Sequence, residues 1–466
     1  MRPRTGTLWP ACALGFFLLS GCGDNRPNII LISVDTLRAD ALGSFGYPRA
    51  TTPHLDAFLN EAVVLRAAYA PEPHTLPSHV SLFTALHPRS HGVEGRMLGA
   101  TPLAQGIETL ATVLGKAGYT NAAFVNTGFL HPAFGLARGF EHYDYFHHAE
   151  ANKGGDVTAF GRSAGATNRA VLEWLDGTRS RPFFLFVHYY DVHSDWERLP
   201  YDAPESYRRM FCSPEEERAL GLQDGEPGGS LFLLEVNKGS VSLRPSEVEH
   251  IRALYDAGVR YTDDAFGELL RELSQRGLCE DSLIVVLADH GEEFMEHGKM
   301  LHSQLFEECV RIPAGVRFPR SAGITPQEVL ARVRIVDFMP TILDFLHLDP
   351  PASIQGASLM PLIEGDAQQS TAPLLFNSSN TGALGITHEG WKLLFDPIRE
   401  EPQLYDLSSD PAEERDVARQ EPAKVETYLR MLKEQHTRLP LLFRDAEPAQ
   451  LDEDTKRHLG TLGYGG

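Results

Sequence analysis

The chain has 466 residues, 42% of them apolar, which suits a large α/β domain with a smaller second domain. Its net charge of −21 argues against nucleic acid as a partner, because no positive surface would balance the phosphates. A small anionic substrate remains compatible, since a metal ion or a helix end reverses the field locally.

The N-terminus is a targeting segment. Arg2 and Arg4 precede the apolar run Leu8–Leu19, which is too short for a stable membrane span and is typical of a signal peptide. The run ends in LSGC, which resembles a bacterial lipobox, so we expect cleavage before Cys22 and acylation of its thiol. A generic signal peptide with a chance cysteine is the alternative. The sequence therefore predicts an exported bacterial lipoprotein, periplasm-facing or in the outer membrane, anchored through Cys22.

The remaining cysteines do not form a disulfide framework. Beyond Cys22 there are only three, Cys212, Cys279 and Cys309, without CxxC or Cys/His metal spacing. One disulfide among them remains open.

The first predicted strand is Asn28–Val34 (NIILISV), a continuous run rich in β-branched residues, as in strands buried on both faces of a parallel sheet. Asp35 follows it directly. A carboxylate at the carboxyl end of such a strand lies where α/β folds bind their ligands. Thr51–Glu61 is predicted as a capped helix.

A second helix is expected to begin just after Thr75. Apolar residues recur at helical spacing from Val80 to Leu86, and Pro77 is tolerated in a first helical turn. The Thr75 hydroxyl would then lie at the positive end of a helix, where an anion is favoured. A simple helix cap is the alternative for this residue.

The middle of the chain alternates between helices and buried strands. Helices are predicted at Thr109–Ala117, Thr167–Leu175, Ser246–Arg276 and Val336–Leu346, and strands at Ala122–Val125, Phe183–Val187, Ser282–Ala288 and Gly315–Phe318. The polar residues that follow these strands include Asn126, His188, Asp191, His193, Asp289 and His290. Residues 201–241 are rich in Pro, Gly and Glu without clear periodicity, and we predict an insertion over the active face.

The C-terminal part has a different sequence pattern. From about residue 367 it contains short strands separated by turns, at Leu374–Asn377, Gly385–Thr387, Trp391–Phe395 and Gln403–Asp406. A charged helix, Lys424–Gln435, is expected to pack against them. The predicted architecture is a doubly wound, mostly parallel α/β sheet flanked by helices (residues 22–366) with a small α+β subdomain (residues 367–466).

Three side chains at the ends of buried strands suit a metal ion. Asp35, Asp289 and His290 would meet at one sheet edge, because the ends of neighbouring parallel strands lie side by side. Two carboxylates, an imidazole and an oxygen from a fourth residue fit one divalent cation: Mn²⁺, Zn²⁺, Mg²⁺ or, less naturally beside an imidazole, Ca²⁺. Taken singly, each residue could instead be a capping or hydrogen-bonding group.

Motifs along nearly the whole mature chain resemble the sulfatases of the alkaline phosphatase superfamily. They are NIILISVD, TLPSHVSLFTALHPRSHGV, FFLFVHYYDVHSDW, ADHGEEFMEHG, LHSQLFEECVRIP and LYDLSSDPAE. The resemblance implies that the nucleophile position is Thr75, that the substrate anion meets His193 and His302, and that the metal ligands are Asp35, Thr75, Asp289 and His290. The residues that we assign to substrate binding are His79, Asn126 and His188.

The departures from this family pattern point to different chemistry. Sulfatases carry Cys or Ser at the nucleophile position for oxidation to formylglycine, whereas Thr75 cannot become that aldehyde. The usual Arg is His79, the two sulfate-binding Lys are replaced by Asn126 and His302, and the second Asp of the first metal motif is Thr36. Threonine nucleophiles belong to phosphodiesterase and headgroup-transferase branches of the superfamily. We therefore expect in-line attack by Thr75 with a covalent intermediate, and phosphoesters favoured over sulfate esters.

Three other functions remain open. One is a non-catalytic surface lipoprotein that binds an anionic glycan or lipid, and another is a headgroup phosphotransferase. The third is a two-metal phosphodiesterase in which a second ion is held by Asp191, His193 and His302.

Overall fold

The computed structural model describes residues 26–94, 101–145, 157–158, 161–178, 182–194, 199–220, 229–365 and 372–442. The predicted signal peptide and lipobox lie outside these residues, as do positions 221–228 of the predicted insertion and the tail beyond residue 442. Of the helices in the described ranges, none combines the length and the apolar character that a membrane span requires.

A nine-stranded mixed sheet forms the core of the protein, in the order β11-β2-β12-β8-β1-β7-β3-β4, with β13 paired to β2. Its parallel part comprises β8 (Ser282–Ala288), β1 (Asn28–Val34), β7 (Phe183–Tyr189), β3 (Thr120–Val125) and β4 (His142–Tyr145). Its other side comprises β12 (Ala314–Arg317), β2 (Val63–Tyr69), β11 (Arg311–Ile312) and β13 (Gln327–Arg334), and β12 runs antiparallel to both β8 and β2. The predicted fold class, mostly parallel with flanking helices, is confirmed.

The apolar runs explain why β1 and β8 lie at the centre. Every residue of both strands is buried, and β1 pairs in parallel with β7 on one side and β8 on the other. The carboxyl ends of these three strands therefore meet at one edge of the sheet. This edge carries the candidate site.

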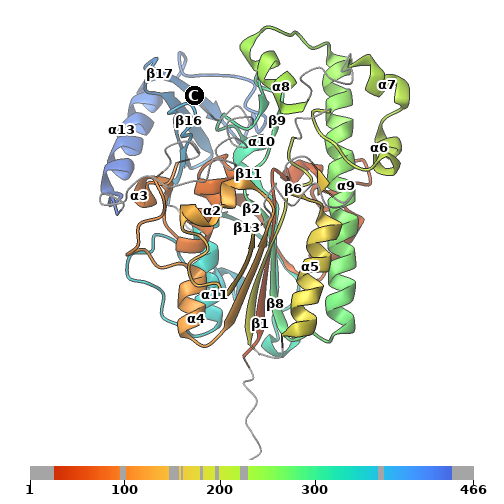
Figure 1. The fold of residues 1–466 in the computed structure, drawn as a ribbon. Helices are drawn as coiled ribbons and strands as arrows, with labels where there is room; N and C mark the ends of the chain where they lie inside the picture. The colour runs from red at the N-terminus through yellow and green to blue at the C-terminus, as the bar shows by residue number, and fades with distance from the viewer. Residues whose placement is uncertain are drawn as a thin grey trace, which may run out of the picture.

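Helices cover both faces of the sheet (Figure 1). One face carries α2 (Thr75–Thr84), α4 (Leu110–Lys116) and α11 (Phe338–Phe345), and the other carries α5 (Ala164–Gly177) and α9 (Pro245–Gln275). The helix α1 (Pro53–Leu59) packs against α9. The remaining short elements are α3 (Pro88–His91), β5 (Val157–Thr158), β6 (Gly161–Arg162), β9 (Glu293–Phe294), β10 (Met300–Leu301), α10 (Glu307–Val310) and α12 (Met360–Ile363).

The segment predicted as an irregular insertion contains three helices, α6 (Glu205–Phe211), α7 (Pro214–Ala219) and α8 (Gly229–Lys238). Each spans three turns or fewer, too short for a clear periodic pattern among the surrounding Pro and Gly residues. The helix α6 packs against α9, and α8 lies against β10, where the Asn237 side chain donates a 2.9 Å hydrogen bond to the Met300 carbonyl.

The C-terminal sheet is antiparallel, with strands β14 (Leu374–Asn377), β15 (Leu384–His388), β16 (Trp391–Asp396) and β17 (Glu401–Asp406). The helix α13 (Pro422–Arg438) packs on it through a buried cluster of Ile386, Leu393, Leu404, Val425, Tyr428 and Leu432. The predicted helix-on-sheet packing is thus observed. Cys212, Cys279 and Cys309 are free and buried, so none of them forms the disulfide that the sequence left open.

Candidate active site and metal centre

Two buried carboxylates lie at the ends of neighbouring central strands. Asp35 follows β1 and Asp289 follows β8, and both side chains are fully buried. Asp289 Oδ1 accepts hydrogen bonds from the backbone N–H groups of Thr36 and His290 at 3.2 and 3.0 Å. Asp289 Oδ2 and Asp35 Oδ1 are buried without a hydrogen-bond partner. Burial raises the pKa of both carboxyl groups, so their ionised forms need a compensating cation.

Thr75 is the first residue of α2, whose N-cap is His74. The cap interpretation of Thr75 is therefore wrong. Its hydroxyl instead lies 3.3 Å from Asp35 Oδ2 and 3.5 Å from His290 Nε2. The ten-residue helix thus presents a hydroxyl beside the buried acids at its positive end.

His290 presents a free lone pair to the same group. Its Nδ1 lies 2.9 Å from the Gly291 carbonyl, which can only accept, so the proton is on Nδ1. Its Nε2 then faces the acids, 3.6 Å from Asp289 Oδ2 and 4.0 Å from Asp35 Oδ1. Burial lowers the pKa of His290, but the two carboxylates outweigh burial and raise it above its ordinary value.

Gly291 allows this turn after β8. A Cβ added there would lie 1.9 Å from the backbone oxygen of Glu308, so no larger residue fits without moving the backbone. The Gly291 N–H also donates to the Cys309 carbonyl at 2.8 Å. Packing therefore restricts the third position of the Asp-His-Gly sequence to glycine, while its first two residues supply the candidate metal ligands.

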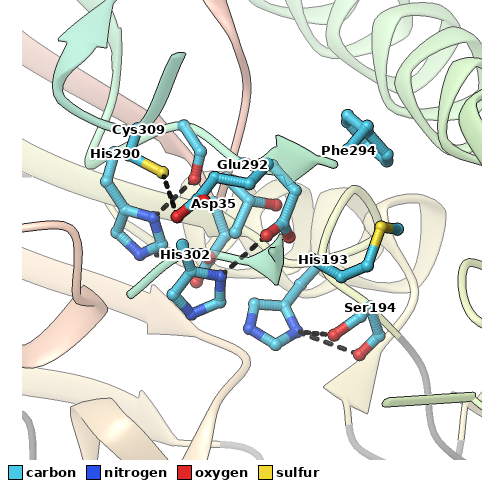
Figure 2. Close-up of polar contacts among 12 residues, drawn as sticks. Asp35, His193, Ser194, His290, Glu292, Phe294, His302 and Cys309 are labelled. Carbon is cyan, nitrogen blue, oxygen red and sulfur yellow. Dashed lines mark hydrogen bonds and ion pairs between the residues drawn. The ribbon is translucent and has the colours of Figure 1, made fainter. Parts of the chain in front are cut away.

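His302 pairs with a carboxylate that the sequence analysis did not single out. Its Nδ1 lies 3.1 Å from Glu292 Oε1, and both side chains are buried (Figure 2). Burial raises the pKa of Glu292 to about 7. Burial, helped by His290, lowers the pKa of His302. The signal available in the sequence was the position of Glu292, two residues after His290 in Asp-His-Gly-Glu.

Two more imidazoles surround His302. Figure 2 shows His193 beside it, with ring centroids 5.2 Å apart. His193 stacks on Tyr190 at 4.6 Å, and its Nε2 has no hydrogen-bond partner. His74, also missed from the sequence, meets the His302 ring edge-on at 5.5 Å.

Two residues assigned to substrate binding have protein partners for their polar atoms. His79 Nδ1 lies 2.7 Å from the Thr75 carbonyl and Nε2 lies 3.0 Å from Ser33 Oγ. The Asn126 side chain donates to Thr167 Oγ1 at 2.7 Å and to the His188 carbonyl at 2.6 Å. It also accepts from Arg162 Nε at 3.3 Å. Both side chains therefore support the walls of the site.

The third of these residues, His188, lies inside β7 rather than after it, because the strand extends two residues beyond its predicted end. Its Nε2 lies 3.2 Å from Asp35 Oδ2, and neither ring nitrogen has a hydrogen-bond partner. Burial lowers the pKa of His188 to about 4, so its imidazole is neutral at pH 7.

The described residues contain three groups with the spacing of metal ligands. They are Asp35, Asp289 and His290; His79, His188 and Asp289; and His54, Asp263 and Asp264. In the third, Asp263 accepts the backbone N–H groups of His54 and Leu55 at 2.9 and 2.7 Å, a structural role at the start of α1. Asp191, His193 and His302 are in none of the three groups, so the two-metal alternative gains no support.

The first group fits the divalent cation that the family resemblance implies. Its ligand atoms lie within 4.8 Å of one another, and two carboxylate oxygens are buried without partners. The His290 tautomer leaves Nε2 available, and Thr75 adds a hydroxyl. Such a donor set suits a small divalent metal ion.

Comparisons with known proteins extend over most of the chain. The sulfatase family profile matches residues 27–348, and a second profile, N-sulphoglucosamine sulphohydrolase, C-terminal, matches residues 295–442. An arylsulfatase of Clostridium perfringens (strain 13 / Type A) is 26% identical over 447 residues, covering 83% of this chain and 89% of that protein.

Solved structures share the fold. A phosphonate monoester hydrolase of Agrobacterium radiobacter has a TM-score of 0.71 and 23% identity, covering 88% of this chain and 96% of that one. A phosphonate monoester hydrolase from Silicibacter pomeroyi has a TM-score of 0.68 and 20% identity, covering 92% of this chain and all of that one.

Proposed function

The chain belongs to the sulfatase family of ester hydrolases, and on that premise we propose a metal-dependent phosphoesterase with Thr75 as its nucleophile. One observation carries the proposal. The Thr75 hydroxyl lies at the N-terminus of α2, 3.3 Å from Asp35 Oδ2 and 3.5 Å from His290 Nε2, instead of capping the helix. It is thus placed beside a candidate cation site and at the positive end of a helix.

We assign the metal to Asp35, Asp289, His290 and Thr75. A divalent cation held there would lower the pKa of the Thr75 hydroxyl and offset negative charge on the ester. A bound cation is needed because, among the described residues, Asp35 and Asp289 form no ion pair with a Lys or Arg. Their ion-pair partners are imidazoles. An anionic ester could not approach these carboxylates without such compensation.

In the first chemical step, Thr75 attacks as the alkoxide, its proton having been lost to solvent. Its Oγ1 forms a bond to phosphorus while the bond from phosphorus to the leaving oxygen breaks. The backbone N–H groups of the first turn of α2 face the remaining ester oxygens. The leaving oxygen takes a proton from His302 Nε2, and Glu292, whose pKa is raised to about 7, passes its own proton to His302 Nδ1 across 3.1 Å. His193 lies beside it as the second candidate acid.

In the second step, water attacks phosphorus, the bond to Thr75 Oγ1 breaks, and the imidazole that gave up its proton accepts one from the water. Threonine makes this second attack necessary. A formylglycine hydrate expels sulfate through its other hydroxyl, whereas Thr75 has only one. The route by two in-line displacements is familiar for phosphorus, which is why we favour phosphate or phosphonate esters over sulfate esters.

We also propose that the chain is a lipoprotein anchored to a membrane through Cys22. The support is the LSGC sequence after the apolar run Leu8–Leu19. Labelling of cells with an alkyne fatty acid should tag the wild-type protein but not Cys22→Ala. Equal labelling of both proteins would contradict the proposal.

A substrate panel tests the activity. Purified protein would be assayed with 4-nitrophenyl sulfate, 4-nitrophenyl phosphate, bis(4-nitrophenyl) phosphate and a 4-nitrophenyl phosphonate, after addition of Zn²⁺, Mn²⁺, Mg²⁺ or Ca²⁺. We expect turnover of a phosphorus ester that depends on the metal and is lost in Thr75→Ala. Turnover of the sulfate alone would overturn the phosphoester preference. Binding of anionic glycan without any turnover would favour the non-catalytic lipoprotein.

A further inference from the structure

The first metal motif of this chain is one carboxylate short of the pattern that it resembles. Thr36 stands at the position of the second Asp, and its backbone N–H donates to Asp289 Oδ1 at 3.2 Å. Thr36 also has a left-handed backbone, with φ of 52°, which is strained for a β-branched residue. The chain therefore retains this turn after β1 without supplying the carboxylate.

His188 lies beside Asp35, the carboxylate that directly precedes Thr36. It is fully buried, and both of its ring nitrogens lack a hydrogen-bond partner. Leaving a buried polar group unpaired costs free energy, so such a residue indicates a partner that the protein chain does not itself provide. The Nε2 atom lies 3.2 Å from Asp35 Oδ2.

The sheet fixes this placement. His188 pairs in register with Ser33 of β1, two residues before Asp35, and the Asp35 N–H donates to the Tyr189 carbonyl at 2.9 Å. His188 thus sits on a central strand between β1 and β3 rather than on a loop. A ligand in this position would be held rigidly.

The other imidazole of the same group, His79, has no lone pair to offer. Its Nδ1 must donate to the Thr75 carbonyl at 2.7 Å, because a carbonyl only accepts. Its Nε2 is then the acceptor for the Ser33 hydroxyl at 3.0 Å. Of the two imidazoles grouped with Asp289, only His188 is available.

The distances suit a single ion. Asp35 Oδ2 lies 3.2 Å from His188 Nε2 and 3.3 Å from Thr75 Oγ1, and His290 Nε2 lies 3.6 Å from Asp289 Oδ2. Ligand atoms on a tetrahedral zinc ion, with bonds of about 2.0–2.1 Å, are about 3.3 Å apart. The two groups that contain His188 and His290 share Asp289, so one ion beside that carboxylate is the common point of both.

We propose that His188 is a ligand of the active-site cation and compensates for the carboxylate missing at Thr36. Two imidazoles and two carboxylates then make this a site for Zn²⁺ rather than for Ca²⁺ or Mg²⁺. This inference rests on the metal dependence in the proposed function. It assigns His188 to the metal rather than to the substrate.

The first test needs no variant. The full mature protein, stripped with dipicolinate and reloaded with one equivalent of Zn²⁺, would be studied by X-ray absorption at the zinc edge. Two imidazole ligands are expected, and a spectrum with one imidazole would overturn the assignment. If the stripped protein binds no divalent ion at all, the metal dependence of the proposed function fails as well.

The second test measures affinity. Competition with a chromophoric chelator should show Zn²⁺ bound at least about 100-fold more tightly than Ca²⁺. His188→Gln should weaken Zn²⁺ binding at least about 10-fold, with Ca²⁺ binding changed less than about 3-fold. The matched control is His91→Gln, a fully buried imidazole outside the ligand groups whose nitrogens are already engaged by Ser81 and Val93, and it should leave Zn²⁺ affinity unchanged. Equal Zn²⁺ affinity in His188→Gln and wild type would overturn the proposal.

Discussion

Two clusters of carboxylates differ in where their positive charge comes from. Near the C-terminal sheet, Lys392 Nζ lies 3.1 Å from Glu307 Oε1 and 3.0 Å from Glu413 Oε1. At the ends of β1 and β8, Asp35 and Asp289 have no Lys or Arg within the described chain, and each keeps one oxygen unpartnered. The first cluster contains its own cation, whereas in the proposed function the second is completed by an ion from solution. This difference separates a structural cluster from the proposed catalytic one.

The largest predicted effect concerns Thr75, which lies beside the cluster of Asp35 and Asp289. Thr75→Ala should lower kcat/KM by about 10⁴-fold or more, as loss of a covalent nucleophile does. Its melting temperature should stay close to that of the wild type, because the hydroxyl does not cap α2. Stopped-time assays and calorimetry check both expectations. The control Thr75→Ser keeps the hydroxyl and should retain most of the activity, and equal rates for Ala and wild type would contradict the assignment.

A substitution in the Lys392 cluster should lower the stability of the protein and leave its catalytic rate unchanged. Lys392→Met leaves Glu307 and Glu413 without their buried partner, and should lower the free energy of unfolding by about 3–5 kcal/mol. The Zn²⁺ affinity of the folded variant should not change. Urea unfolding measures the loss. Lys424→Met, which removes a partly exposed ammonium over the Trp391 ring, is the control and should cost about 1 kcal/mol or less.

Titration of the same cluster gives a smaller effect with a definite sign. Burial raises the pKa of Glu413 from 4.5 to about 7, although Lys392 lowers it. Because the folded value lies above the unfolded one, the stability from this group is complete below about pH 4.5 and is lost as pH rises through about 7. Glu413→Gln should therefore make the free energy of unfolding less dependent on pH between 5 and 8, by at most about 3 kcal/mol. A pH dependence as steep as that of the wild type would argue that Glu413 does not titrate in this range.

The smallest predicted effect concerns the carboxylate that orients His302. Glu292→Gln should slow hydrolysis of esters with poor leaving groups, such as phenyl, by about 10–100-fold. Esters with a good leaving group, such as 4-nitrophenyl, need less proton transfer and should be affected much less. A loss that is equal for both substrates would point to a structural role for Glu292 instead.

The central strands could be predicted because their sequences carry the signal of burial on both faces. The boundaries of β1 and β8 agree with the predicted ones, since NIILISV and SLIVVLA are continuous apolar runs. The edge strand β13 was missed because its exposed residues leave no clear alternation. The strand β2 was missed as well, although most of it is buried, because Arg66 and two alanines interrupt its apolar pattern.

The site was predictable only where strand ends specify it. The proximity of Asp35 and Asp289 follows from the parallel pairing of β1 with β8. The pairing of Glu292 with His302 depends on a turn through β9 and β10, and the orientation of His188 depends on two extra residues of β7. Those features come from tertiary packing, which no local pattern in the sequence encodes.

The central claim is that Thr75 becomes covalently bonded during turnover. Metal-loaded protein would be mixed with a phosphate monoester that it turns over, quenched in acid within milliseconds, digested and examined by mass spectrometry. A phosphoryl group on Thr75, absent from Thr75→Ala and from samples without substrate, is the predicted result. Full turnover by the Thr75→Ala variant, or a covalent group on another residue, would contradict the claim.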